Sequence, residues 1–195
     1  MSSAHQPSAP VAARVIRTAE LAPQPWANGR GRTREVYRQL AAGSTESTLW
    51  RLSLADIEAT GPFSSLPGMD RYLLSAAPVR LRLSIDGTEH ELRHTQVVSF
   101  AGDARVSTVA VEGCAQALNL MVRTGLRGGI EVLRGDADLP VTVATAATIA
   151  YVVLDGTVTL DGRPLRRLDA VLPGAEESAL VLRDAVVARI QVEVP

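Results

Sequence analysis

Short runs of alternating apolar and polar residues, separated by turn-forming pairs, constrain the fold of this chain most strongly. Alternation with a period of two is typical of half-buried β-strands. The first series of these runs occupies residues 72–74, 79–85, 89–92, 97–100, 106–111 and 117–122. Asp86-Gly87 and Gly102-Asp103 are hairpin-type turns between runs. Many short strands at regular spacing predict an all-β sandwich or barrel.

The same order of runs and turns recurs in the second half of the chain. Its runs lie at residues 130–133, 141–145, 149–154, 157–160, 171–172, 180–182 and 186–194. Asp161-Gly162 takes the place that Asp86-Gly87 has in the first half. We interpret this echo as an internal duplication, the alternative being that any two hairpin pairs look alike.

A duplication predicts two antiparallel barrels in tandem within one chain. We expect a first barrel over residues 14–125 and a second, smaller one over residues 126–195. Residues 1–13, rich in Ser, Ala and Pro, are expected to form a disordered tail.

The composition excludes several classes of function. A net charge of -1 argues against a nucleic acid or an anionic membrane as partner. All 20 basic residues are arginines, so no lysine is present to form a Schiff base or a P-loop. No apolar run approaches the ~20 residues that span a bilayer, and the N-terminus lacks the order of a signal peptide. We therefore expect a cytoplasmic protein.

Residues 50–71 are the stretch around which a site is expected. The stretch begins as an alternating strand, in which Arg51 and Ser53 share one face. That face either meets solvent or lines a polar pocket. The stretch ends as a loop that carries Phe63 and Leu66, which is too much apolar surface to remain in water. Such a loop is typically held against the body of the protein, where it forms the wall of a site.

Metal and nucleophilic chemistry find little support in the sequence. His90-Glu91-Leu92-Arg93-His94 has the spacing of a zinc-protease motif, which works only on a helix. On a strand the two histidines lie ~13 Å apart at ~3.3 Å per residue, too far for one ion. The single cysteine, Cys114, excludes an intramolecular disulfide and is interpreted as a buried structural thiol. We expect no metal, no cofactor and no catalytic nucleophile.

A polar set on the β scaffold, bordered by aromatic side chains, remains as the candidate ligand site. Arginine is the natural bidentate partner of a carboxylate, and Asn and Ser complete the orientation of a ligand. The alternative is that Arg34–Glu35 and Asp70–Arg71 are structural ion pairs. The candidate ligand-binding residues are Trp26, Asn28, Thr33, Arg34, Glu35, Arg51, Ser53, Phe63, Ser64, Asp70, Arg71 and Asn119.

An ordered set of motifs over residues 26–123 resembles the HutD family, which also includes the Ves proteins. The motifs are Trp26-x-Asn28-Gly29-x-Gly31-x-Thr33-Arg34-Glu35, Trp50-Arg51-x-Ser53-x-Ala55, Gly61-Pro62-Phe63-Ser64-x-x-Pro67-Gly68-x-Asp70-Arg71, Phe100-x-Gly102-Asp103 and Asn119-x-Met121. The chain departs from the family pattern at Arg30, at Leu66 and at Ala117-Leu118-Asn119, the last of which removes a carboxylate near the expected pocket.

The resemblance implies a cupin-like fold of two β-barrels and a link to bacterial histidine utilisation. Proteins of this family are thought to bind a pathway metabolite and to moderate flux without catalysis. We therefore expect a small carboxylate-bearing ligand, such as urocanate or a formylated glutamate derivative, no nucleic acid or membrane partner, and a monomer or weak homodimer. The alternatives are a metal-independent cupin-type isomerase or hydrolase acting on a small organic acid, and a pure interaction scaffold.

Overall fold

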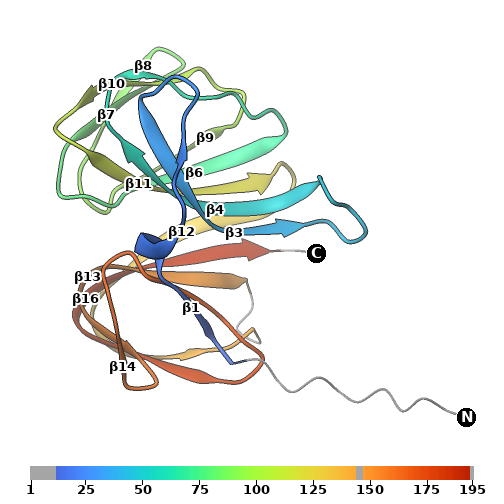
Figure 1. The fold of residues 1–195 in the computed structure, drawn as a ribbon, viewed down its shortest axis with the longest axis vertical. Coiled ribbons are helices and arrows are strands. Elements are labelled where there is room, and N and C mark those ends of the chain that lie inside the picture. Colours follow the sequence, from blue (N-terminus) through green and yellow to red (C-terminus); the bar gives the residue numbers. More distant parts are fainter. Residues whose placement is uncertain (1–11, 144–146, 194–195) are drawn as a thin grey trace, which may run out of the picture.

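The computed structural model describes residues 12–143 and 147–193 (Figure 1). Within them the chain is built of β-strands, apart from one turn of 3-10 helix, η1 (Thr18–Glu20). The prediction of an all-β fold is thus confirmed. Most of the predicted tail, residues 1–11, lies outside the described residues. No helix among the described residues is long and apolar enough to cross a membrane.

The N-terminal half contains two antiparallel sheets that pack face to face. The larger sheet has the order β2 (Gln24–Pro25), β3 (Gly31–Leu40), β4 (Thr48–Ile57), β11 (Ala115–Arg123), β6 (Met69–Ser75) and β9 (Val97–Ala101). The smaller sheet has the order β5 (Gly61–Pro62), β10 (Val106–Val111), β7 (Leu81–Ile85) and β8 (Thr88–Leu92). Their facing apolar side chains form one core, which includes Ile57, Leu73, Leu81, Leu83 and Val106.

The C-terminal half is a single antiparallel sheet. Its main path runs β1 (Arg14–Ile16), β15 (Ala170–Leu172), β13 (Thr148–Leu160), β16 (Ser178–Glu193) and β12 (Arg127–Val141), with β14 (Arg163–Leu165) paired to β13. This sheet contains the three longest of the described strands, β12, β13 and β16; in Figure 1 β13 and β16 are orange to red, and the N-terminal strand β1 is blue. None of the three sheets is closed into a barrel by the pairing of the described strands. The arrangement as two tandem barrels, and their boundary at residue 125, therefore stay predictions.

The longest strands join runs that the sequence predicts as separate strands. The run 130–133 and the first residue of the run 141–145 both belong to the continuous strand β12. Gly135 interrupts its pairing with β16 as a bulge, at a φ of 88° that glycine adopts without strain. Gly156 has the same role in β13, where its φ is 79° and a Cβ would collide with the backbone oxygen of Asp184. Each of these glycines thus separates two predicted strands in the sequence but forms a bulge within one continuous strand in the structure.

The two halves share the geometry of their Asp-Gly turns. Asp86 and Gly87 have φ values of 49° and 88°, and Asp161 and Gly162 have φ values of 49° and 74°. Both pairs form hairpin turns with two left-handed residues, as their sequences predict. The carboxylate of Asp86 accepts a hydrogen bond from the Arg105 backbone N–H at 2.9 Å. The carboxylate of Asp161 accepts one from the Ala179 N–H at 2.7 Å.

A second pair of turns matches equally well. Thr95, after β8, has a φ of 69°, and its N–H donates to the Ser75 carbonyl at 2.7 Å. Leu168, after β14, has a φ of 68°, and its N–H donates to the Val153 carbonyl at 2.7 Å. Ser75 of the first half therefore corresponds to Val153 of the second. These shared turns support an internal duplication.

The larger N-terminal sheet lies between two interiors because its strands alternate. Trp50, Leu52 and Leu54 of β4 belong to an apolar core that also contains Val152 and Ile190 of the C-terminal half. The intervening residues of β4 face away from this core, toward the smaller N-terminal sheet. The halves are therefore joined by apolar packing, and one face of β4 is left free to line a site.

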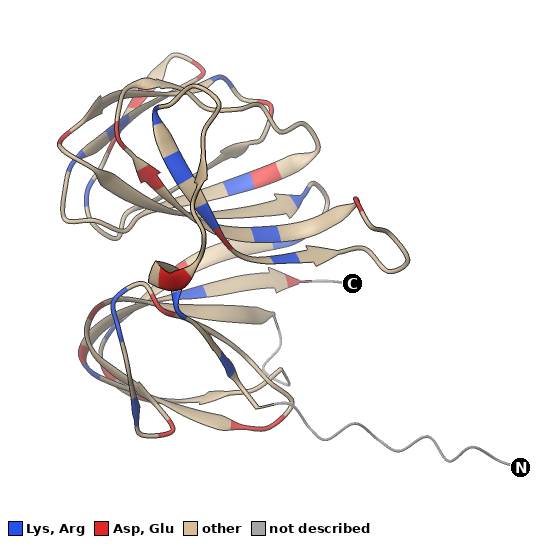
Figure 2. Ribbon diagram, viewed as in Figure 1, with Lys and Arg blue, Asp and Glu red and all other residues tan. Residues whose placement is uncertain are grey.

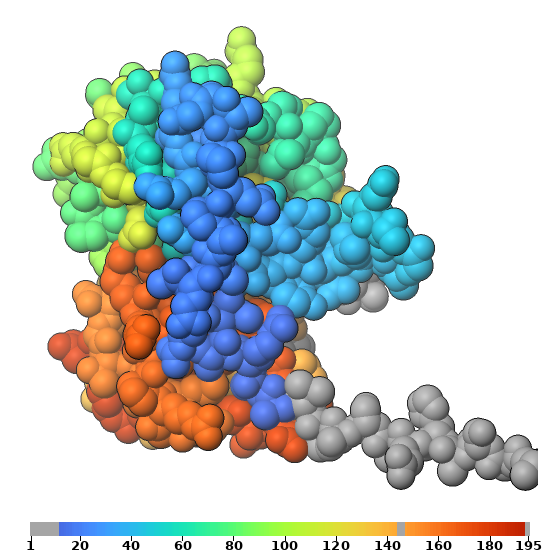
Figure 3. Space-filling model, viewed as in Figure 1, coloured from blue at the N-terminus to red at the C-terminus, as the bar shows by residue number. Residues whose placement is uncertain are grey.

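The N-terminal segment crosses from one half to the other, as the blue residues of Figure 3 show. β1 pairs with β15 in the C-terminal sheet, whereas β2 pairs with β3 in the N-terminal one. Between them, Arg17 forms an ion pair with the buried carboxylate of Asp169. The Thr18 hydroxyl donates to the Leu168 carbonyl at 2.9 Å. The segment thus straps the two halves together.

Candidate functional site

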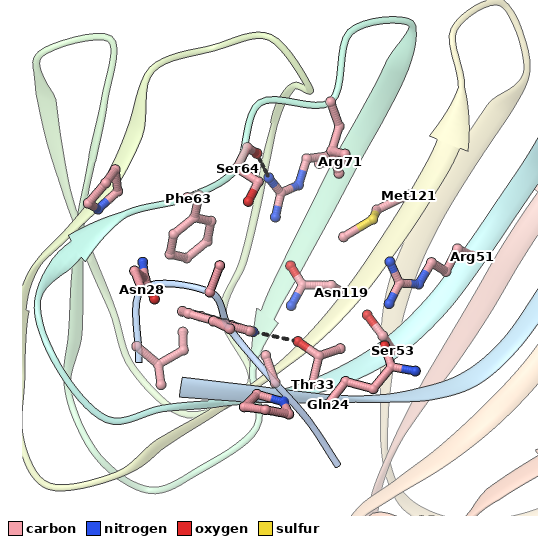
Figure 4. Close-up of a pocket in the computed structure, with 17 residues that line it drawn as sticks. Gln24, Asn28, Thr33, Arg51, Ser53, Phe63, Ser64, Arg71, Asn119 and Met121 are labelled. Carbon is pink, nitrogen blue, oxygen red and sulfur yellow. Dashed lines mark hydrogen bonds between the residues drawn. The ribbon is translucent and has the colours of Figure 1, made fainter. Parts of the chain in front are cut away.

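A cavity of about 460 Å³ opens between the larger N-terminal sheet and the loop that follows β4 (Figure 4). Its size lies in the range of small-molecule sites, roughly 300–1,000 Å³. The strands β3, β4, β6 and β11 supply one side of it, and the segment 24–28 and the loop 62–66 supply the rest. The polar lining residues are Gln24, Asn28, Thr33, Arg51, Ser53, Ser64, Arg71 and Asn119.

Arg71 of β6 is a cation without a carboxylate partner among the described residues. Its relative exposure is only 6%. Its guanidinium lies over the rings of Phe63 and Phe100, 5.3 and 5.0 Å from their centroids, and Nη1 donates to the Ser64 carbonyl at 3.3 Å. Nε is buried without a hydrogen bond. Burial, and next the positive charge of Arg51, lower the pKa of Arg71 to about 10.

Arg51 of β4 lies in the same cavity but is partly neutralised. Its Nε is 2.8 Å from Glu35 Oε2, yet that Nε has no hydrogen bond, so the contact is an ion pair without hydrogen-bond alignment. Glu35 Oε2 also lies 2.6 Å from Nη2 of Arg38. In the strand register both Arg51 and Arg71 are opposite Met121 of β11, which brings the two cations to one face.

Two buried polar side chains lie near the arginines with atoms that no hydrogen bond satisfies. Ser53 and Asn119 are directly opposite each other on β4 and β11, and their relative exposures are 1% and 5%. Ser53 Oγ and Asn119 Oδ1 have no partner, whereas Asn119 Nδ2 makes one long bond of 3.4 Å to the Ala117 carbonyl. Buried polar atoms are normally hydrogen-bonded. These two atoms are therefore places where a ligand can form bonds.

An aromatic wall faces the polar side of the cavity. Trp26 and Phe63 meet edge to face, with ring centroids 6.0 Å apart. The indole N–H of Trp26 donates to the Thr33 hydroxyl at 2.7 Å, which fixes the ring. Gly31 permits this position, because a Cβ there would come within 3.2 Å of the Trp26 ring.

The loop at the mouth is held down at Gly102. The Leu66 N–H donates to the Gly102 carbonyl, and the Gly102 N–H donates to the Met69 carbonyl, each at 2.7 Å. A Cβ on residue 102 would collide with the backbone oxygen of Leu66 and approach that of Met69 to 2.6 Å. The apolar side chains of Phe63 and Leu66 are thereby directed into the cavity wall.

Nine of the twelve candidate residues line the cavity and three do not. Arg34 forms an ion pair of 2.6 Å with Asp56. Glu35 pairs with two arginines, and the Asp70 carboxylate lies 3.4 Å from the Thr124 hydroxyl. Leu66 lies in the cavity wall, as expected for its loop, whereas sequence reasoning missed Gln24 and Met121 as lining residues. Met121 could have been predicted from the alternation of strand side chains, because it lies two residues after Asn119 on the same strand and therefore on the same face.

The histidine motif and the cysteine lie outside this cavity. His90 is in strand β8 and His94 is in the turn after it, so the segment is not the helix that a zinc site requires. No group of three metal-ligating acidic, histidine or cysteine side chains gathers among the described residues. Cys114 is exposed, so its interpretation as a buried thiol is wrong. Partial desolvation, followed by Asp56 and Glu58, raises its pKa, which disfavours a nucleophilic thiolate.

Charged residues outside the cavity are mixed in sign. Figure 2 shows acidic and basic positions interspersed over both halves of the molecule. Several of them form cross-strand pairs at the surface, such as Arg183 with Asp138 at 2.8 Å. Arg71 differs from these surface residues because it is the only buried arginine among the described residues.

Comparison with known proteins matches the HutD family model to residues 18–188. An uncharacterised 21.2 kDa protein in the hutC 3′ region of Pseudomonas putida is 32% identical over 108 residues, 55% of this chain and 56% of that protein. Protein Ves of Citrobacter koseri is 37% identical over 101 residues, 50% of this chain and 51% of Ves. The chain thus spans about half the length of the curated relatives it matches.

Solved structures extend the similarity over nearly the whole chain. The structure of HutD from Pseudomonas fluorescens SBW25 has a TM-score of 0.77 and 27% identity, covering 93% of this chain and 98% of that one. A cupin 2 conserved barrel domain protein from Leptotrichia buccalis, at 12% identity, shares the fold alone; its TM-score is 0.60 and coverage is 92% of this chain and 96% of that one. The fold is therefore cupin-like.

Proposed function

This chain belongs to the HutD family, and on that premise we propose that it binds a small carboxylate-bearing metabolite of histidine utilisation and moderates pathway flux without catalysing a reaction. The observation that carries the proposal is Arg71, a buried cation that faces a cavity and has no carboxylate partner among the described residues. A buried charge is costly unless it is paired. An anionic ligand supplies the missing partner.

The other lining residues suit a ligand of this class. Ser53 and Asn119 offer a hydroxyl and an amide oxygen that have no hydrogen bond, and Arg51 adds a second cation. Trp26 and Phe63 provide a flat apolar wall. A planar imidazole-acrylate such as urocanate, or the acyl amide of a formylated glutamate derivative, has both a carboxylate for the arginines and a flat group for this wall.

The context of the family supports the link to histidine utilisation. The Pseudomonas putida relative is named by its position in the hutC 3′ region, and a solved structure that is 27% identical and covers 93% of this chain is named HutD. We accordingly assign the metabolite to that pathway rather than to small organic acids in general.

The non-catalytic part of the proposal rests on the side chains in the cavity. Its described lining contains no acidic residue, histidine or cysteine. Glu35 is paired with Arg51 and Arg38, and Asp70 lies outside the lining. General acid–base catalysis needs a titratable group within hydrogen-bond reach of the substrate. The alternative, a metal-independent cupin-type isomerase or hydrolase, would therefore need Glu35 or Asp70 to turn inward on binding.

Two finer points of architecture accompany the proposal. We propose that the halves are two related cupin-like barrels, divided near residue 125, and that the protein is a monomer or weak homodimer. Size-exclusion chromatography with light scattering tests the oligomeric state. A stable tetramer would contradict it.

The deciding experiment follows binding and turnover together. The purified chain is titrated with urocanate, with formylglutamate and with histidine in a calorimeter, and each mixture is then analysed by mass spectrometry. We expect saturable binding of at least one carboxylate whose mass stays unchanged. Product formation that Glu35→Gln or Asp70→Asn abolishes would establish the enzyme instead.

A further inference from the structure

A second cavity, of about 610 Å³, lies at the junction of the two halves. β3 and β4 contribute Tyr37 and Trp50 to one side of it, and β13 contributes Thr148 and Ile149 to the other. We propose that this junction cavity is a separate binding site for a flat, ring-bearing organic anion. Nothing in the proposed function of the first cavity requires it.

Two aromatic rings form the floor of the junction cavity. The rings of Tyr37 and Trp50 are tilted by 34°, with centroids 5.2 Å apart. Trp50 is only 5% exposed, so its ring is held in place by the surrounding core. The floor thus offers aromatic surface on which a flat ligand can stack.

Thr148 supplies a polar group that has no hydrogen bond. Its relative exposure is 6%, so the side chain is more than nine-tenths buried, and Oγ1 has no hydrogen-bond partner. The residue lies at the start of β13 and lines the cavity opposite the aromatic floor. A hydroxyl left without a bond in a core position costs stability. A polar group of a ligand in the cavity would satisfy it.

Arg14 provides the positive charge at the rim. Its guanidinium carbon lies 5.6 Å from the centroid of the Tyr37 ring, in the range of a cation–π contact. It forms no ion pair with the described residues, and the described lining of the junction cavity contains no carboxylate. The local charge is therefore positive and unbalanced, which favours an anion over a neutral ligand.

The chemistry of these residues defines the ligand class. An aromatic ring stacks on Tyr37 and Trp50, its carboxylate reaches Arg14, and a polar substituent bonds with the hydroxyl of Thr148. Ile149 and Leu172 close the apolar side of the site. The same strands present Arg51 and Ser53 to the first cavity on their opposite face, so the two sites have separate linings.

The test uses the intrinsic fluorescence of Trp50. The chain has two tryptophans, and Trp26→Phe together with Arg71→Met removes the tryptophan and the buried cation of the first cavity. In this background the full chain is titrated with 4-nitrobenzoate, a planar aromatic carboxylate that quenches indole. We expect the quenching to saturate and to be reversed by benzoate, which lacks the nitro group and competes for the same site. The neutral, size-matched 4-nitrobenzamide should bind much more weakly.

Two variants assign the effect to the junction cavity. Arg14→Gln removes an exposed cation without touching the core, and we expect about tenfold weaker binding. Thr148→Val keeps the shape and removes the hydroxyl; we expect weaker binding of a probe with a polar ring substituent and a higher Tm, because an unsatisfied group disappears. Arg82→Gln, on the surface of β7, is the matched control for Arg14→Gln.

Specific outcomes would overturn the proposal. Quenching that rises linearly with concentration and is unchanged by Arg14→Gln shows collisions rather than a site. Equal affinity for 4-nitrobenzoate and 4-nitrobenzamide shows a neutral, apolar occupant and rejects the anion. Because Arg14 is exposed, its variant gives a result even if Thr148→Val fails to fold.

Discussion

The interior of the C-terminal half is filled with apolar side chains, whereas the interior of the N-terminal half remains partly open. Both halves use the same turns, Asp86-Gly87 in one and Asp161-Gly162 in the other. The C-terminal interior packs Tyr151, Val153, Val158, Leu160, Val171, Leu180, Leu182 and Val187 into one cluster. The N-terminal half has an apolar core at one end and the cavity with Arg71 at the other.

Equivalent positions of the two sheets show how the difference arises. Because Ser75 corresponds to Val153, Leu73, two residues earlier, corresponds to Tyr151. Leu73 lies opposite Asn119 on the neighbouring strand, and Tyr151 lies opposite Arg189, so Asn119 and Arg189 are equivalent. Arg189 is satisfied by an ion pair with Glu131, whereas Asn119 Oδ1 has no partner. The same framework thus closes one interior and leaves polar groups unmet in the other. The unmet groups of the N-terminal interior mark it as the place where the pathway carboxylate is expected.

The largest contrast is expected for truncations of buried side chains. Leu182→Ala removes a fully buried side chain of the C-terminal interior and should lower the free energy of unfolding by about 2–5 kcal/mol. Met121→Ala, at the wall of the first cavity, should cost less than about 1.5 kcal/mol, because it enlarges a space that already exists. Urea unfolding of both variants measures the contrast. Equal losses would contradict the difference between the two interiors.

The next effect concerns Arg71. Arg71→Met removes the buried cation and keeps much of the side-chain volume, so binding of the pathway carboxylate should weaken by about a hundredfold, or roughly 2.7 kcal/mol. Stability without ligand should rise, because an unpaired buried charge is replaced by an apolar group. Calorimetry and urea unfolding give the two values. Arg82→Met, at an exposed arginine paired with Glu89, serves as the control and should change neither.

A smaller effect is expected at Arg51. Arg51→Ala should weaken carboxylate binding by about tenfold, equivalent to 1.4 kcal/mol. The loss is smaller than at Arg71 because Glu35 already neutralises part of the charge. Glu35→Gln releases Arg51 from that ion pair, so binding should become tighter. If the Arg51→Ala variant bound the carboxylate more tightly than the unaltered protein does, this arginine would be excluded as an anchor of the ligand.

The smallest effect is a pH dependence of the folding stability, which arises from His94 at the junction of the two halves. His94 and Arg167 occupy equivalent turn positions, and burial, followed by Arg167, lowers the pKa of His94, with Arg134 acting in the same direction and Asp155 against it. The unfolded chain then binds a proton at a higher pH than the folded one does. The stability held by neutral His94 is therefore lost as pH falls from about 7 through the ordinary histidine pKa of about 6.5.

Urea unfolding at pH 5, 6 and 7 tests this expectation. His94→Gln should flatten the slope of stability against pH in that window, and His90→Gln should leave it unchanged. A slope that persists in His94→Gln would assign the dependence to other groups.

The sequence predicted the elements whose cause is local. Asp86-Gly87 forms the expected turn because its residues tolerate positive φ. Arg51 and Ser53 share a face because strand side chains alternate. The continuity of β12 through Gly135 was not predicted, because only its partner β16 shows that this glycine is a bulge rather than a break.

The relative importance of the arginines also lies beyond the sequence. In the sequence Arg51 belongs to an alternating run and Arg71 ends the loop that follows it, but only Arg71 is covered by Phe63 and Phe100 and lacks a carboxylate. Those contacts come from separate loops and strands. Likewise, Glu35 is withdrawn from the site by arginines on its own and the neighbouring strand, which alternation along a single strand does not indicate.

The N-terminal strap has a consequence for the synthesis of this protein. β1 leaves the ribosome before all the other described strands, yet its partner β15 begins at Ala170. Contacts between residues so far apart in sequence form late, because a long loop must close first. The sheets of the N-terminal half can pair while the chain is still growing, since their strands end at Arg123. The first of the described strands can therefore be seated only after the chain has emerged as far as β15.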